Sequence, residues 1–220
     1  MKSLILICAS ILLLSVATAN GQVFFGGNIG FNYNGGSNSV GGTSTDQTST
    51  TIFTFSPMGG YFLSDKFAIG AQINISTNKV NIPGDGYVAT STTNLETSYG
   101  LSPFIRYYAL TINKFSIFGQ GYIALSLGSN SSTTGGVKTD GPSSTEFGFG
   151  IIPGISFDLT SKISLEATIN LLNLGYTYNV SSLTTNGIEN KNSTSNFYFG
   201  AGVNNIVNTG DIMIGAIIKL

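Results

Sequence analysis

Residues 67–77, FAIGAQINIST, alternate strictly between two kinds of position. The odd-numbered positions as far as Ile75 are apolar, whereas the even-numbered positions hold Ala, Gly, Gln, Asn and Ser. Alternation with a period of two predicts a β-strand with one apolar face and one more polar face. The apolar face covers a packed core in a soluble sheet, whereas in a membrane barrel it contacts lipid and the polar face lines the interior.

The same alternation recurs along the chain and predicts eight strands. These strands cover residues 22–34, 51–63, 67–77, 95–110, 115–128, 144–159, 163–177 and 196–220. Short connections (64–66, 111–114, 160–162) alternate with long ones rich in Ser, Thr, Asn and Gly (about 35–50, 78–94, 129–143, 178–195). Strict alternation of this kind is typical of barrels that have tight periplasmic turns and long extracellular loops.

Two regions depart from the alternation. At residues 171–174, LLNL, the period slips, which predicts a β-bulge. In the last strand the apolar positions are odd-numbered at Phe197 and Phe199 but even-numbered at Ile214 and Ile218, which requires a break around 204–211. Because both chain termini should lie on the periplasmic side, we predict eight strands with the last one bent or bulged, and ten strands is the alternative.

A repeat marks three of the predicted hairpins. Each copy has a proline, an aromatic residue four positions later and a turn that ends in lysine. The three sets are Pro57, Tyr61 and Lys66; Pro103, Tyr107 and Lys114; Pro153, Phe157 and Lys162. Because proline removes one ladder donor, we expect a bulge or bend at each proline.

The charged residues of the strands all lie on the phase opposite the apolar one. They are Glu96, Arg106, Glu146, Asp158, Glu166 and Lys219. A Lys or Arg on a lipid-facing surface costs about 2–4 kcal/mol at the midplane, so this distribution favours lipid on the apolar face. We expect these six residues to form a charge network inside the barrel, with a Glu166–Lys219 pair and Arg106 reaching across.

Composition narrows the possible functions. Only 9% of the residues are charged, against roughly 25% in soluble domains, and the net charge of −1 gives no case for nucleic-acid binding. The chain has no histidine, the usual proton carrier at neutral pH, and its only cysteine is Cys8. We therefore expect no enzymatic activity, no metal site and no cofactor.

The N-terminal residues have the pattern of an export signal. Lys2 precedes an apolar run from residue 4 to residue 16, and Ala17-Thr18-Ala19 provides an A-x-A cleavage site. We predict a signal peptide over residues 1–21, cleaved after residue 19 or 21, and a barrel domain over residues 22–220. Cys8 lies in the predicted signal peptide, so the mature chain has no disulfide or thiolate site.

Together these features resemble the small outer-membrane β-barrels of the OmpA/OmpX type, also described as outer-membrane-protein beta-barrel or porin family domains. The C-terminal Gly215, Ile218 and Leu220 resemble the family's recognition signal for the barrel assembly machinery, although a final Leu replaces the usual aromatic residue. The resemblance implies an all-β, eight-stranded antiparallel up-and-down barrel in the lipid of the bacterial outer membrane, assembled by that machinery as a monomer.

The predicted interior phase contains bulky side chains. Phe24, Met58, Phe62, Phe104, Phe118, Tyr122 and Ile152 share it with Asn28, Gln72, Asn74 and Gln120. Eight strands enclose a space that side chains just fill, so we expect a plugged barrel that acts as a structural or surface-interaction protein and contacts an extracellular ligand or surface through its loops. The alternatives are a narrow porin-like channel and a soluble ligand-binding barrel.

Overall fold

The computed structural model describes residues 22–84, 90–169, 172–185, 187–201 and 212–220. Its strands are β1 (Gln22–Asn34), β2 (Ser37–Val40), β3 (Thr43–Asp46), β4 (Ser49–Ser64), β5 (Phe67–Ile82), β6 (Thr92–Ile112), β7 (Phe115–Thr134), β8 (Val137–Asp158), β9 (Ile163–Ile169), β10 (Leu172–Thr185), β11 (Ile188–Ala201) and β12 (Ile212–Lys219). The predicted signal peptide and the predicted break at 204–211 lie outside the described residues.

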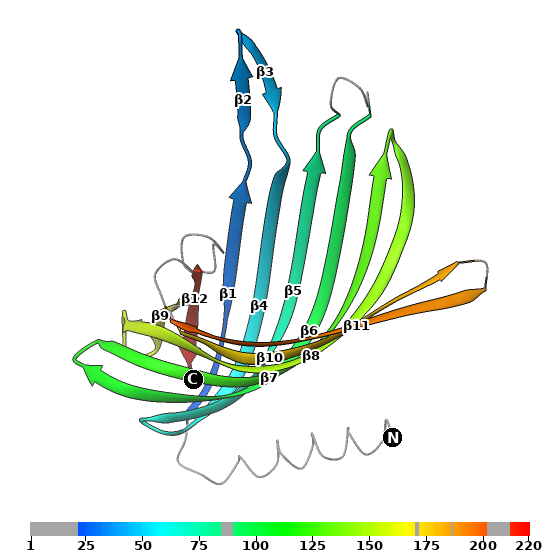
Figure 1. Cartoon of the computed structure of the whole chain (residues 1–220). Helices are drawn as coiled ribbons and strands as arrows, with labels where there is room; N and C mark the ends of the chain where they lie inside the picture. The colour runs from blue at the N-terminus through cyan, green and yellow to red at the C-terminus, as the bar shows by residue number, and fades with distance from the viewer. Residues whose placement is uncertain (1–21, 85–89, 170–171, 186, 202–211) are drawn as a thin grey trace.

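Eight of these strands close into an antiparallel ring (Figure 1). Around the ring the order is β1, β4, β5, β6, β7, β8, β9 and β12, and β12 pairs with β1 to complete it. The prediction of an eight-stranded up-and-down barrel is therefore confirmed. The described part of the chain contains no helix that is long and apolar enough to cross a membrane.

The predicted seventh strand is divided between β9 and β10. Thr168 of β9 lies opposite Gly154, and Leu174 of β10 lies opposite Ile151, so six residue steps on this strand span only three on β8. This change of register confirms the irregularity expected near 171–174. The predicted last strand is likewise divided, into β11, which pairs with β10, and β12, which pairs with β9 and β1. Phe197 and Phe199 of β11 and Ile214 and Ile218 of β12 are all exposed.

The strands extend further into the predicted long loops than their side-chain pattern indicated. β7 and β8 remain paired as far as Thr134 opposite Val137, and β2 and β3 form a separate hairpin. Gly41 and Gly42 (φ 61° and 85°) and Gly135 and Gly136 (φ 58° and 82°) make the turns with positive φ that such hairpins require. The strand bounds predicted in these polar segments were wrong because backbone pairing continues there without apolar alternation.

The bulges expected at Pro57 and Pro103 are absent. Pro57 pairs with Gly27, and Pro103 pairs with Ala71. The register shifts lie further along the same strands, between Phe62 and Ser64 of β4 and between Tyr108 and Leu110 of β6. Proline lacks the backbone N–H that would donate to one of the two neighbouring strands. Pairing with the other neighbouring strand keeps the register unchanged. Pro153 lies where the partner of β8 changes from β10 to β9.

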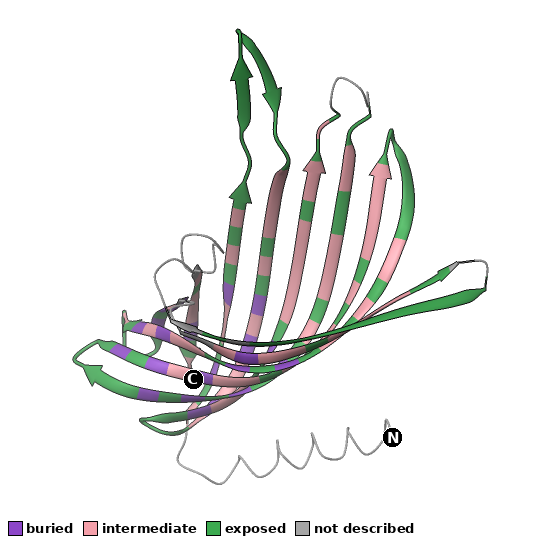
Figure 2. Ribbon diagram, viewed as in Figure 1, coloured by how far each residue is buried: buried purple, intermediate pink, exposed green. Residues whose placement is uncertain are grey.

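The two faces of the barrel wall differ in the way the alternation predicts. The outer face exposes large apolar side chains, among them Phe25, Ile29, Phe31, Phe55, Ile73, Leu101, Ile105, Ile123, Leu125 and Phe149. Tyr61 shares the odd-numbered phase of Phe53 and Phe55, which predicts the outer face, but it is an exception at 7% exposure. The buried residues gather inside the barrel toward the end with the short turns (Figure 2). That end is therefore the packed part of the interior.

Candidate functional site in the barrel interior

Three phenylalanine rings fill the interior near the short turns, each opposite a glycine on the neighbouring strand. Phe24 pairs with Gly60, Phe104 with Gly70 and Phe118 with Gly154. A Cβ atom at Gly70 would lie 2.6 Å from Cζ of Phe104, and one at Gly60 would lie 2.5 Å from Cζ of Phe24. The rings therefore occupy the space that a side chain at each glycine would need.

Further aromatic contacts extend this packing across the lumen. The ring centroids of Phe24 and Phe62 are 5.1 Å apart, those of Phe62 and Tyr108 are 5.8 Å apart, and those of Tyr108 and Phe118 are 5.5 Å apart. The four rings come from β1, β4, β6 and β7. The prediction that bulky residues occupy the interior is thus confirmed.

Arg106 is the central charged residue of this interior. Its side chain has 0% exposure, and its Nη1 donates to both carboxylate oxygens of Glu166, at 2.7 and 2.9 Å. Nε and Nη2 donate to Oε1 of Gln120 at 3.1 and 2.7 Å, and Nη1 also donates to the Tyr108 hydroxyl at 3.3 Å. The guanidinium carbon lies 4.2 Å from the centroid of the Phe118 ring. This cluster connects β6, β7 and β9 through side chains.

The stability of the buried Arg106–Glu166 ion pair depends on the groups around it. Removing two charges from water costs several kcal/mol for each ion, which their attraction offsets only when the remaining donors and acceptors are also satisfied. Gln120 and Tyr108 supply that satisfaction, and Phe118 offers a favourable ring face. The ion pair and its neighbours Gln120, Tyr108 and Phe118 therefore stabilise one another.

Lys219 pairs with Asp158 and not with Glu166. Its Nζ lies 3.2 Å from Oδ1 of Asp158, which also accepts a hydrogen bond from the Ser164 hydroxyl. The predicted Glu166–Lys219 pair is wrong because Glu166 lies opposite Gly215, four residues before Lys219 on β12. The two strands were correctly identified as neighbours, but their register keeps Lys219 away from Glu166. Arg106 of β6 reaches across the barrel, as expected, and takes Glu166 as its partner.

A layer of amides and hydroxyls lies next to the Arg106 cluster. Asn74 accepts hydrogen bonds from Ser56 (3.0 Å) and Gln72 (2.6 Å) and donates to Ser102 (2.7 Å). Sequence reasoning placed Gln72 and Asn74 in the interior but did not identify this network. Ser56 and Ser102 could have been assigned to the interior as well, because they occupy the same even-numbered phase as Gln72 and Asn74.

Glu96 and Glu146 are separate from both ion pairs. Glu96 lies opposite Asn78 and Asn130, and Glu146 lies opposite Ser126 and Asn179. In the described part of the chain, neither carboxylate has a hydrogen-bond or ion-pair partner. The six charged residues therefore form two pairs and leave two carboxylates apart, and do not make one network.

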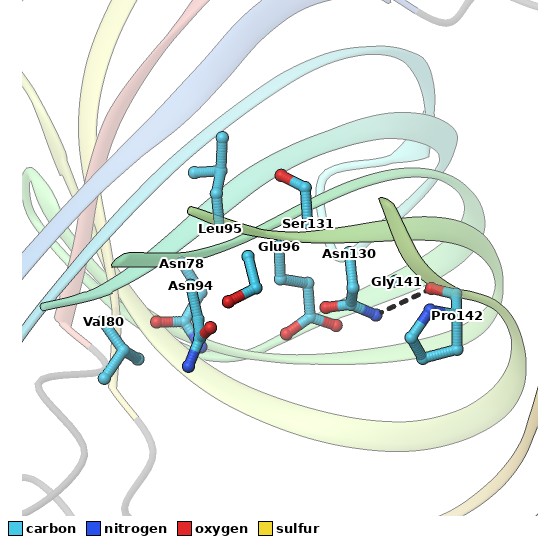
Figure 3. A pocket seen from close by; sticks show the side chains of 10 residues that line it. Asn78, Val80, Asn94, Leu95, Glu96, Asn130, Ser131, Gly141 and Pro142 are labelled. Carbon is cyan, nitrogen blue, oxygen red and sulfur yellow. Dashed lines mark hydrogen bonds between the residues drawn. The ribbon is translucent and has the colours of Figure 1, made fainter. Parts of the chain in front are cut away.

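A cavity of about 330 Å³ lies beside Glu96 (Figure 3). Its lining comes from β5, β6, β7 and β8 and includes Asn78, Asn94, Asn130 and Pro142. Within the described ranges, no group of three or more His, Cys, Asp or Glu side chains could hold a metal ion. The cavity instead presents one carboxylate among amides and hydroxyls.

The C-terminal residues close the ring. Gly215 lies opposite Asn28 of β1, and the Asn28 side chain fills the space that a Cβ atom at Gly215 would occupy. Ile218 and Leu220 are exposed on the outside, and the Leu220 amide donates to the Val23 carbonyl at 2.9 Å. The predicted assembly signal therefore contains both an interior and an outward-facing part.

Comparison with known proteins assigns the fold to a family. A family model described as "Outer membrane protein beta-barrel domain" matches residues 6–175. A search of curated proteins found no match. Similar solved structures include neisserial surface protein A (18% identity, 90% of this chain and 97% of that chain, TM-score 0.41) and OprG from Pseudomonas aeruginosa (14%, 92% and 96%, TM-score 0.42). Another is Ail from Yersinia pestis in complex with the heparin analogue sucrose octasulfate (10%, 92% and 100%, TM-score 0.43).

The family match agrees with the ring of strands and with their apolar outer face, and the family's proteins belong to the bacterial outer membrane. The chain therefore belongs to the outer membrane protein beta-barrel family.

Proposed function

We propose that this protein is a plugged outer-membrane barrel that blocks solutes at its periplasmic end and acts through the hairpins at its extracellular end. In this arrangement the apolar outer face contacts lipid and the short turns face the periplasm, as in other barrels of this type. The N-terminal residues 1–21 serve as the export signal. Gly215, Ile218 and Leu220 direct assembly of a monomeric barrel by the barrel assembly machinery.

The Arg106–Glu166 pair is the observation that supports the plug. The two side chains have 0% and 1% exposure although they lie inside a barrel whose interior could hold water. Phe104, Phe118 and Met58 surround the guanidinium group. A water-filled passage at this level would hydrate the pair, so its burial favours a closed interior over a porin-like channel.

The hairpins at the other end offer the surface for contact with the outside. β2 and β3 extend beyond β1 and β4, and all their residues are exposed (Figures 1 and 2). Three turns at this end place an exposed β-branched residue beside glycine: Val40 beside Gly41, Val137 beside Gly136 and Ile188 beside Gly187. Apolar side chains at polar hairpin tips suit contact with another molecule.

Solute flux tests the plug. Liposomes that contain the refolded protein are expected to release ions and small sugars no faster than protein-free liposomes, because the interior is packed at the Arg106 level. The control is gel mobility, which should differ between unheated and boiled samples of the folded barrel. Measurable flux would contradict the plug and support the channel. Unchanged mobility together with release by a salt wash would support a soluble barrel.

Shortening the first hairpin tests the division of roles between barrel and hairpins. Replacing residues 37–46 with a two-residue Asn-Gly turn is expected to change the free energy of unfolding by no more than about 0.5 kcal/mol. The reason is that β2 and β3 pair only with each other. Circular dichroism during urea unfolding measures this energy. Failure of the shortened chain to assemble would show that the hairpin is structural.

A further inference from the structure

We propose that the cavity beside Glu96 binds a small hydroxylated primary amine, with the Glu96 carboxylate as the counter-ion of its ammonium group. The inference deepens the proposed function and rests on it only for the direction of access, which is from the extracellular end. The ligand-binding chemistry follows from the cavity itself.

The cavity is built from two adjacent rows of the inner wall. In the first row Glu96 of β6 lies between Asn78 of β5 and Asn130 of β7. In the second row Asn94 lies between Val80 and Ser132 on the same three strands. Residues directly opposite on antiparallel strands have Cβ atoms about 4.5–5.5 Å apart, so both amides of the first row are within side-chain reach of Glu96.

A bulge in β8, where Gly141 and Pro142 lie opposite the single residue Asn130 of β7, supplies the end wall. The register between β7 and β8 shifts between Ser129 and Ser131, so Asn130 has no regular partner on β8 although it remains paired with Glu96 on β6. The Asn130 Nδ2 atom donates to the Pro142 carbonyl at 3.1 Å, as the dashed line in Figure 3 shows. Asn78, Asn94, Glu96 and Asn130 point to one side of the sheet, whereas Leu95 and Ser131 point to the other (Figure 3). The bulge thus closes the cavity next to the carboxylate.

Two acceptor groups of the first row have no donor among the described residues. Glu96 has no partner among the described residues, and Oδ1 of Asn78 is buried and likewise unpartnered there. Asn130 donates one N–H of its Nδ2 to Pro142, and its Oδ1 is available as a further acceptor. No Lys or Arg belongs to the cavity lining. An ammonium group has three donors and a positive charge, which matches this row of oxygen atoms.

The size and the second row favour an organic amine over a bare ion. A volume of about 330 Å³ lies in the range of small-molecule sites and exceeds the space that one metal ion needs. Asn94 and Ser132 can exchange hydrogen bonds with hydroxyl groups, and Val80 and Pro142 offer carbon surface. A compact amine with hydroxyl groups, of the size of an amino sugar, uses all three features.

Calorimetric titration of the refolded protein in detergent micelles tests the proposal. The probes are glucosamine, glucose, N-acetylglucosamine and calcium chloride, at a pH at which glucosamine is protonated. Glucosamine is expected to bind, and glucose and N-acetylglucosamine to bind at least about tenfold more weakly, because a hydrogen bond to a charged group contributes more than one between neutral groups. Glu96→Gln is expected to lose glucosamine binding by about tenfold or more.

Glu146→Gln is the matched control, because Glu146 is an interior carboxylate outside the cavity lining. It is expected to bind glucosamine as the wild type does. Four results would overturn the proposal: no binding of glucosamine, equal binding of glucose, equal losses in both variants, or binding of calcium alone. Liposome flux tests the plug separately, so a conducting barrel and an empty amine site are distinguishable failures.

Discussion

Replacing Arg106 with alanine is expected to lower the free energy of unfolding of the barrel by about 3–5 kcal/mol. The substitution leaves the Glu166 carboxylate buried at 1% side-chain exposure without its partner, and it removes both hydrogen bonds to Gln120. Urea unfolding followed by far-ultraviolet circular dichroism measures the change, since the chain has no tryptophan to report by fluorescence.

Two variants control this experiment. Lys219→Met breaks a pair whose side chains are 19% and 35% exposed, and we expect it to cost no more than about 1 kcal/mol. The double variant Arg106→Met with Glu166→Gln removes both charges together and is expected to recover much of the stability that Arg106→Ala loses. Equal losses in Arg106→Ala and Lys219→Met would contradict the assignment of Arg106 as the central residue of the plug.

Replacing Gly70 with alanine is expected to destabilise the barrel by about 1–3 kcal/mol. The added Cβ atom would lie 2.6 Å from the Gly59 carbonyl oxygen and 2.6 Å from Cζ of Phe104. The carbonyl belongs to the backbone of the paired strand and cannot move aside, so the wall of the barrel must shift. The same unfolding measurement in urea gives the size of the effect.

Gly119→Ala is the matched control for Gly70→Ala. No heavy atom lies within 4 Å of the position that its Cβ would take, so we expect a change within about 0.5 kcal/mol. Both substitutions reduce the freedom of the unfolded chain in the same way, and the difference between them isolates the steric effect. Equal stability of the two variants would show that the aromatic rings do not need the glycine surfaces.

The sequence alone determined which side of the wall most residues of the apolar strand segments face. Alternation with a period of two has only two possible phases, and a charge on the lipid face is too costly to be tolerated at most positions. Arg106, Glu166 and the aromatic residues could therefore be assigned to the interior from their positions in the alternation. The same argument detected the phase reversal between Phe199 and Ile214.

Only the tertiary structure decided which interior residues meet. Pairing partners depend on the stagger between strands and on bulges, and neither is encoded in the alternation of one strand. This is why Arg106 pairs with Glu166 and Lys219 with Asp158, against the predicted Glu166–Lys219 pair. The polar strand segments that line the cavity, and the β8 bulge opposite Asn130, lack apolar alternation, so the cavity beside Glu96 becomes visible only when the backbone ladders are formed.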